Sequence, residues 1–328
     1  MRPAAARLDP AAPDARPGRT CPASYRYSPA VFRRAPEIVA QAVYVIGGLY
    51  GNVEALAAIR EMAAAEPQPP ILVFNGDFHW FDVSPADFAA IAEGVAPHPA
   101  LRGNVETEIA MEHEGAGCGC AYPMDVSDAE VSRSNEIMAR LRRAARDLPA
   151  ASAHLAALPM TLVANVGGAR VGIVHGDAVS LAGWGFAHDR LDEPRHRRWI
   201  DAAFDEAAVD VFASTHTCLP ALRSFAAGGL ARIVANNGAA GMPNFEGRLA
   251  GLITRIGTRP HRGGSIAAAR SAGVHVELLE VPYDHDRWVE RFLASWPPGS
   301  PAHDSYWRRI TRGPRHDVDT ASRLAPRA

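Results

Sequence analysis

The chain has 328 residues, of which 48% are hydrophobic and 21% charged, and this composition is sufficient for one large α/β domain or two smaller ones. Its formal net charge of -2 indicates no basic surface of the kind that binds nucleic acid or anionic lipid. No apolar run is long enough to span a membrane, and residues 1–36 lack the apolar core of a secretory signal, so we expect a cytoplasmic protein.

The first predicted elements form a βαβ unit. Residues 1–38 are rich in Pro, Ala and Arg and predict a flexible N-terminal segment. A β-branched apolar run at residues 43–46 predicts a buried strand, and Asn52 is placed to cap the helix that follows it. A second buried strand is predicted at residues 71–74, so the order is strand, helix, strand.

The middle of the chain predicts two helices and then mainly strands. The helices are expected at residues 84–95 and 127–146, the second being long and amphipathic. Gly167 and Gly168 separate two apolar runs, which is typical of a β-hairpin. The strands predicted after this hairpin lie at residues 209–213, 221–225, 231–235, 249–256 and 274–281.

The C-terminal part predicts one more helix, at about residues 284–295, before a tail rich in Pro, Arg and His. No internal repeat is present. We therefore expect a flexible N-terminal segment, one folded domain and a C-terminal tail, with the boundaries 1–38, 39–296 and 297–328.

Polar residues follow several of the predicted strands, at the strand ends where α/β proteins form their ligand sites. Each of these segments is a weak signal by itself, because a lone Gly-Asp is commonly a turn and a lone His is commonly a loop residue. Their order and spacing along the chain carry more information. The segments are Gly48-Leu49-Tyr50-Gly51-Asn52, Gly76-Asp77, Arg102-Gly103-Asn104, His175-Gly176 and Thr215-His216-Thr217-Cys218-Leu219-Pro220.

This series resembles the motifs of the calcineurin-like metallophosphoesterases, which run Asp-x-His-Gly-Asn, Gly-Asp, Gly-Asn-His-Asp/Glu, His-Gly and Gly-His-Thr-His-x-Pro. Residues 236–243 resemble the family's Asn-Pro-Gly-Ser-x-Gly-x-Pro segment, and residues 281–284 resemble a strand ending of its bacterial phosphodiesterase branch. The resemblance covers about residues 43–285. It implies an α/β (α+β) fold with four layers, an αββα sandwich, whose motifs converge at one edge.

The resemblance also implies a metal centre. Members of the family hold two ions bridged by one Asp, which matches Asp77. The further ligands of one ion match Asn104, His175 and His216, whereas the private ligands of the other are replaced by Gly48, Tyr50 and Cys218. Carboxylate, amide oxygen and imidazole suit Mn²⁺, Fe²⁺ or Zn²⁺. We therefore expect one divalent ion and a second site that is lost or rebuilt.

The implied activity is hydrolysis of a small phosphorylated substrate, either a phosphomonoester or a phosphodiester, nucleotides included. Asp77, Asn104 and His175 are the candidate catalytic residues, because an ion bound there would activate water and polarise a phosphoryl oxygen. Val105 stands where the family has a His, so the usual general acid is missing. The alternative is a catalytically lapsed protein of this fold that binds a metal or nucleotide or has a regulatory role.

A nucleotide-binding loop of another kind is a weaker alternative. Residues 47–51 are glycine-rich and lie between a predicted strand and a helix, as in dinucleotide-binding proteins. The glycine spacing differs from G-x-G-x-x-G, and no further βαβ units follow cleanly.

The four cysteines are too few for a disulfide framework. Cys218 stands where an imidazole would reach the emptied site, and Cys118 and Cys120 follow the Asn104 loop. These three thiols predict a second soft-metal site, an iron–sulfur centre or a redox-sensitive thiol pair. The alternative is that they are small apolar residues in glycine-rich loops.

Four residues are further candidates for substrate binding. Tyr50 could donate to a phosphate oxygen or fill the vacated space, and Arg102 could clamp a phosphate. His79, two residues after Asp77, could line the pocket. The fourth candidate is Asn52, in the first motif.

Overall fold

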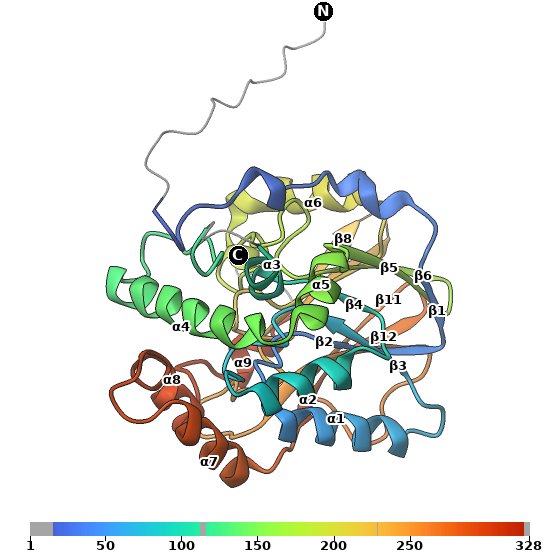
Figure 1. The fold of residues 1–328 in the computed structure, drawn as a ribbon. Helices are drawn as coiled ribbons and strands as arrows, with labels where there is room; N and C mark the ends of the chain where they lie inside the picture. Colours follow the sequence, from blue (N-terminus) through green and yellow to red (C-terminus); the bar gives the residue numbers. More distant parts are fainter. Residues whose placement is uncertain (1–15, 112–115, 228, 325–328) are drawn as a thin grey trace, which may run out of the picture.

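The computed structural model describes residues 16–111, 116–227 and 229–324. In this part of the chain, two six-stranded mixed sheets are stacked and helices cover their outer faces (Figure 1). The strand orders are β1-β5-β6-β7-β9-β8 in the first sheet and β11-β12-β10-β2-β3-β4 in the second. The predicted four-layer αββα sandwich is therefore confirmed.

The bounds of the elements are as follows. The strands are β1 Ile38–Ala40, β2 Ala42–Ile46, β3 Ile71–Asn75, β4 Ala100–Leu101, β5 Thr161–Val166, β6 Ala169–Val174, β7 Val211–Ser214, β8 Ala221–Ala227, β9 Leu230–Asn236, β10 Gly251–Gly257, β11 Ala267–Ser271 and β12 Val274–Val281. The α-helices are α1 Val53–Ala65, α2 Pro85–Val95, α3 Asn104–Ala110, α4 Asp128–Arg146, α5 Pro149–Ala157, α6 Arg197–Ala207, α7 His285–Ser295, α8 Pro301–Arg312 and α9 Val318–Ser322. Short 3₁₀ helices lie at η1 Ala23–Tyr25, η2 Pro29–Arg33, η3 Arg190–Asp192 and η4 Pro194–His196.

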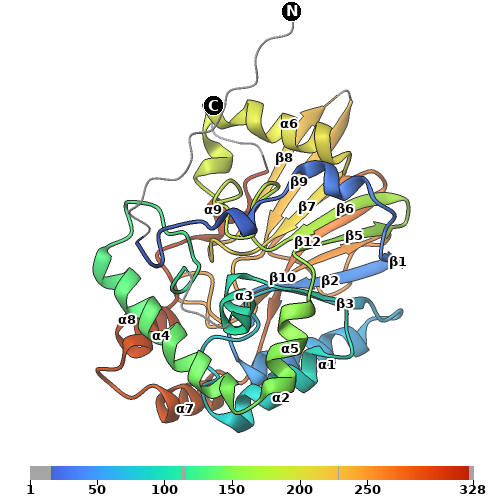
Figure 2. The same cartoon turned by 45° about the horizontal axis from the view of Figure 1, so that its top comes forward.

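The alternation of side chains along β2 shows how the layers are held together. Val43 and Val45 point into the core between the two sheets, whereas Tyr44 and Ile46 pack with α1, α2 and α7 on the outer face. Successive residues of a strand point to opposite faces, so a strand buried on both faces must be apolar throughout. Figure 2 shows α6 covering the other sheet, where Phe204 packs on Phe212.

Parallel strand pairs bring the predicted motifs to one edge of the sandwich. In the second sheet β2 pairs in parallel with β3, and in the first sheet β7 lies parallel to both β6 and β9. Because the carboxyl ends of parallel strands lie at the same edge, the loops after these strands meet there. The expectation that the motifs converge at one edge is therefore confirmed for the loops that carry them.

The predicted cap of α1 is confirmed, but several helices were not predicted. Asn52 accepts a hydrogen bond from the Ala55 N–H at 3.0 Å and so caps α1. Helices α3, α5, α6, α8 and α9 are additional, and α6 lies in the part expected to be mainly strands. The buried residues of α6 (Ile200, Ala203, Phe204 and Ala207) have the spacing of one helix face.

The predicted N-terminal segment and C-terminal tail are only partly covered by the structure. Residues 1–15 and 325–328 lie outside the described residues. Between them and the central domain, Tyr25 and Phe32 are buried near the start of the chain, and α8 and α9 lie near its end. The predicted domain boundaries themselves stay predictions.

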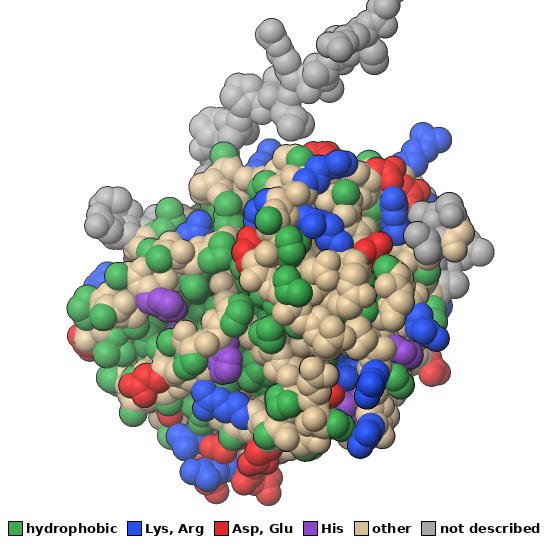
Figure 3. All heavy atoms as spheres, turned by 90° about the vertical axis from the view of Figure 1, so that its right-hand side faces the viewer, with side chains coloured by type: hydrophobic (Ala, Val, Ile, Leu, Met, Phe, Trp, Pro, Cys, Tyr) green, Lys and Arg blue, Asp and Glu red, His purple; other side chains and the backbone are tan. Residues whose placement is uncertain are grey.

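The surface carries charges of both signs. On the face shown in Figure 3, arginine side chains are interspersed with Asp and Glu side chains. This agrees with the formal net charge of -2. Among the helices that the structure describes, none is long and apolar enough to cross a membrane.

Candidate metal centre and its cavity

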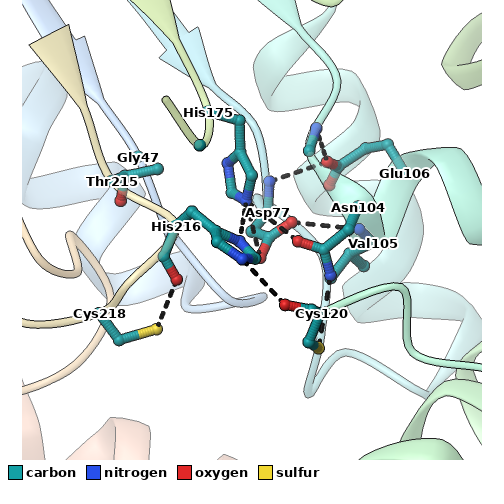
Figure 4. Close-up of polar contacts among 12 residues, drawn as sticks. Gly47, Asp77, Asn104, Val105, Glu106, Cys120, His175, Thr215, His216 and Cys218 are labelled. Carbon is teal, nitrogen blue, oxygen red and sulfur yellow. Dashed lines mark hydrogen bonds and ion pairs between the residues drawn. The ribbon is translucent and has the colours of Figure 1, made fainter. Parts of the chain in front are cut away.

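Four side chains predicted as metal ligands lie together where the two sheets meet (Figure 4). Asp77 follows β3, Asn104 is the first residue of α3, His175 follows β6 and His216 follows β7. One ligand atom from each of Asp77, His175 and His216 lies within 4.8 Å of the others. Asp77 and His216 are therefore close enough to share one ion.

His175 lies at the centre of this group. Its Nε2 atom is 3.1 Å from Asn104 Oδ1, 3.1 Å from His216 Nδ1 and 3.3 Å from Asp77 Oδ2. Its Nδ1 atom lies 3.0 Å from the Asn75 carbonyl oxygen, so Nδ1 carries the donated proton and Nε2 faces the group.

The other ligands are oriented in the same way, by main-chain carbonyl groups. His216 Nε2 lies 3.1 Å from the Cys120 carbonyl oxygen, which leaves Nδ1 facing the centre. Asn104 Nδ2 donates to the Cys118 carbonyl oxygen at 2.9 Å, which turns Oδ1 toward the centre. Such contacts behind the ligands hold them in a binding orientation. One carboxylate, one amide oxygen and two imidazole nitrogens therefore fit a single divalent ion.

A buried glutamate that the sequence analysis did not single out holds the Asp77 turn. Asp77 has a left-handed backbone, with φ of 50°. The Glu106 carboxylate accepts hydrogen bonds from the N–H groups of Asp77, Phe78 and Gly103 at 2.8, 3.0 and 2.8 Å. Burial and the charge of Asp77 raise the pKa of Glu106. The sequence could have revealed Glu106, because this residue occupies the Asp/Glu position of the third motif.

Gly103 is required by the close approach of this turn to α3. A Cβ atom at Gly103 would lie 2.2 Å from Asp77 Oδ1, which no side chain permits. The Val105 N–H donates to the same oxygen at 3.1 Å. The start of α3 therefore supplies hydrogen bonds and space to the Asp77 carboxylate.

The surroundings of His175 and His216 shift the pKa values of the two imidazoles in opposite directions. Burial and the neighbouring His175 lower the pKa of His216 to about 3, so its imidazole is neutral at neutral pH. Burial opposes protonation of His175, but the Asp77 carboxylate outweighs it and raises the pKa of His175 above its ordinary value. A proton on His175 therefore competes with a metal ion.

Metal affinity should fall on acidification for this reason. Between pH 8 and pH 6 we expect the affinity for Zn²⁺ or Mn²⁺ to fall by up to about tenfold per pH unit, because one proton is displaced from His175. Calorimetric titration in buffers of different ionisation enthalpy measures the affinity and the proton release together. A His154→Ala variant, at an exposed position of α5, should show the same profile as the unmodified protein. An affinity independent of pH would contradict the assignment.

A cavity of about 170 Å³ adjoins the metal centre. Asp77, Asn104 and His216 form part of its wall, and the other walls are largely aromatic. Val105 also lines it, so an apolar side chain faces the cavity at the position where the resemblance predicts a general acid. The remaining lining residues are Tyr50, Trp80, Cys120, Tyr122, Trp184, Thr217, Cys218, Tyr306 and Arg309.

Side chains fill the space where the sequence resemblance would place the private ligands of a second ion. Gly48 has φ of 64°, and a Cβ atom there would lie 2.7 Å from Cε2 of the Tyr50 ring. The Tyr50 hydroxyl lies 2.9 Å from Cys218 Sγ. Burial raises the pKa of Tyr50 well above its usual range and also raises that of Cys218, so both groups are neutral. Tyr50 thus occupies the space into which an acidic side chain at position 48 would project.

The three candidate thiols do not form one cluster. All four cysteines are free, and Figure 4 shows Cys120 and Cys218 on either side of His216. Cys120 and Cys218 line the cavity, whereas Cys118 is fully buried. Among the described residues, no group of three metal-ligating side chains includes a cysteine. The cysteine-based second site therefore stays a prediction from the sequence.

Of the four residues predicted to bind substrate, only Tyr50 lines the cavity. Asn52 uses both polar atoms in the fold, since it caps α1 and donates to the Gly241 carbonyl oxygen at 2.9 Å. His79 is buried, with Nδ1 2.5 Å from Asp82 Oδ2 and its ring stacked on Phe88.

Arg102 is also absent from the cavity lining. Its guanidinium donates to the Ala156 carbonyl oxygen at 3.1 Å, near the end of α5. The predictions that Asn52, His79 and Arg102 bind substrate therefore stay predictions, since none of the three lines this cavity.

Comparison with known proteins supports the fold. No protein-family model matches the sequence, and no curated protein does. A solved metallophosphoesterase from Sphaerobacter thermophilus is similar, with a TM-score of 0.51 and 16% identity, over 84% of this chain and 99% of that one. A hypothetical protein from Pyrococcus horikoshii OT3 is also similar, with a TM-score of 0.57 and 17% identity, over 85% and 100% of the two chains.

Two features together indicate the fold class of this chain: the stacked sheets, and a buried Asp–His–His group at the edge where the sheets meet. The chain has the calcineurin-like metallophosphoesterase fold. The expectation of this fold from the sequence motifs is confirmed.

Proposed function

We propose that the protein is a metal-dependent phosphoesterase that works with one divalent ion. The observation that carries the proposal is the convergence of Asp77, Asn104, His175 and His216 on one point. All of them except His175 line the adjoining cavity. Tyr50 fills the neighbouring space, which argues against a second ion held in the usual way. The substrate class that suits such a centre is a small phosphorylated molecule.

The chain's own residues would prepare the site for this reaction. A divalent ion bound by the four ligands would lower the pKa of a coordinated water and polarise a phosphoryl oxygen. Main-chain carbonyl groups orient both imidazoles and the Asn104 amide. Aromatic side chains form much of the cavity wall, and a ligand that displaced water from this space would strengthen electrostatic interactions inside it.

The absence of a free imidazole as general acid restricts the leaving group. Val105 replaces the family's His, and His216 is the only imidazole among the described residues that line the cavity. Since His216 is also a proposed metal ligand, it is unavailable as a proton donor. Esters of acidic alcohols, such as aryl phosphates, should therefore react faster than alkyl esters.

Activity assays with defined metals test the proposal. Protein loaded with Mn²⁺, Fe²⁺ or Zn²⁺ should hydrolyse an aryl phosphate, with a rate that falls steeply as the leaving alcohol becomes less acidic. An Asp77→Asn variant should lose at least about a hundredfold in kcat/KM, because the carboxylate contributes to the site's charge. Chromogenic assays across a series of leaving groups measure both effects.

The second candidate function is that of a lapsed family member which binds a metal and a phosphorylated ligand without turnover. The loss of three metal ligands and of the general acid favours it. Binding of metal and of inorganic phosphate without hydrolysis of any ester under the same conditions would support this alternative and contradict the proposed activity.

A further inference from the structure

Helix α8, from the segment that the sequence analysis treated as a tail, contributes a cation to the cavity. The Arg309 side chain of this helix lines the same cavity as Asp77 and His216. Figures 1 and 2 show α8 beside α4, far along the chain from the motifs of the metal centre. Arg309 is the only arginine among the described lining residues, and the chain has no lysine.

The guanidinium of Arg309 is held by uncharged groups. Its Nε atom donates to the Pro243 carbonyl oxygen at 3.1 Å, and Nη2 donates to the Cys218 carbonyl oxygen at 2.8 Å. Among the described residues, Nη1 makes no hydrogen bond and no carboxylate pairs with this guanidinium. The adjacent Arg308 differs, because it pairs with Glu246 at 3.0 Å and is exposed.

Arg309 is half-buried and has no carboxylate counterion among the described residues, whereas buried charges are commonly paired. Asp77 is the only acid among the described residues of the cavity wall, and it belongs to the proposed metal centre. The two main-chain contacts restrict the guanidinium before any ligand arrives. A planar guanidinium with a free N–H edge matches the oxygens of a phosphoryl group.

We propose that Arg309 binds the phosphoryl group of the substrate and that the substrate is a phosphomonoester; this rests on the proposed function. A terminal phosphate has three free oxygens, which the metal centre and Arg309 can share. A diester would have to place a second organic group in the same space. The cavity of about 170 Å³ leaves little room for it, since pockets for drug-sized ligands measure roughly 300–1,000 Å³.

The binding of inorganic phosphate tests this role without relying on turnover. Its affinity should be measured by calorimetry for metal-free and metal-loaded protein. In both forms, Arg309→Met should weaken phosphate binding by at least about tenfold, and Arg309→Lys should weaken it less because the charge remains. Arg308→Met is the matched control and should bind phosphate as the unmodified protein does. Metal content and thermal unfolding, measured on each variant, separate lost contacts from a disturbed fold.

Two results would overturn the inference. Unchanged phosphate affinity in Arg309→Met and Arg309→Lys would remove Arg309 from the binding site. Hydrolysis of an aryl diester as fast as that of the matching monoester would overturn the substrate class. A protein that binds phosphate through Arg309 but hydrolyses no ester would contradict the proposed function while supporting the role of Arg309.

Discussion

Replacing Asp77 by alanine should abolish metal retention, and so should His216→Ala. Each substitution removes one of the four proposed ligands, so the remaining groups would form an incomplete coordination shell. We expect a fall from about one ion per chain to a trace, measured by elemental analysis after gel filtration. Asp77→Asn should retain more metal than Asp77→Ala, because an Asn side chain offers an oxygen and tolerates the left-handed backbone.

A buried carboxylate outside the centre provides the control. Asp82 lies five residues after Asp77 and pairs with His79, without contact to the metal ligands. Asp82→Asn should therefore reduce stability but leave the metal content unchanged. If Asp77→Ala and His216→Ala both kept full metal content, the ion would have to be bound elsewhere.

Glu106→Ala should be the most destabilising of the substitutions considered. The Glu106 carboxylate accepts from three buried N–H groups at 3.0 Å or less, and from the His79 N–H at 3.3 Å. A buried donor left without a partner costs about 1–3 kcal/mol, so we expect a loss of at least about 3 kcal/mol in the free energy of unfolding. Metal affinity should fall as well, because the Asp77 turn loses its support. Denaturant unfolding and metal titration measure the two effects.

The chain offers a matched control for Glu106. Glu130 occupies the same position in the first turn of α4 and closes a capping box with Ser127, but it is exposed. Since water can replace its contacts, Glu130→Ala should cost about 1 kcal/mol or less. Equal losses for the two variants would mean that the Glu106 carboxylate is not the main support of the Asp77 turn.

Local sequence patterns were sufficient for the elements with clear periodicity and end signals. The apolar run of β2 and the Asn52 cap of α1 are examples. Helix α3 was missed because seven residues are too few to display a helical period. Helix α8 carries Ala302, Tyr306 and Ile310 at four-residue spacing, but the composition around it was interpreted as a tail.

The sequence by itself predicted which ligand types are present, in what order they follow the strands and, through the family resemblance, which three are replaced. It could not determine whether Tyr50 coordinates, donates or fills space, because that depends on the distance between its ring and Gly48. The tertiary structure alone places Arg309 at the cavity and gives His79 and Arg102 partners outside its lining. The physical reason is that the spacing of motifs along the sequence indicates only where the backbone runs at the strand ends. The direction of each side chain is decided by the partners that distant segments bring to it.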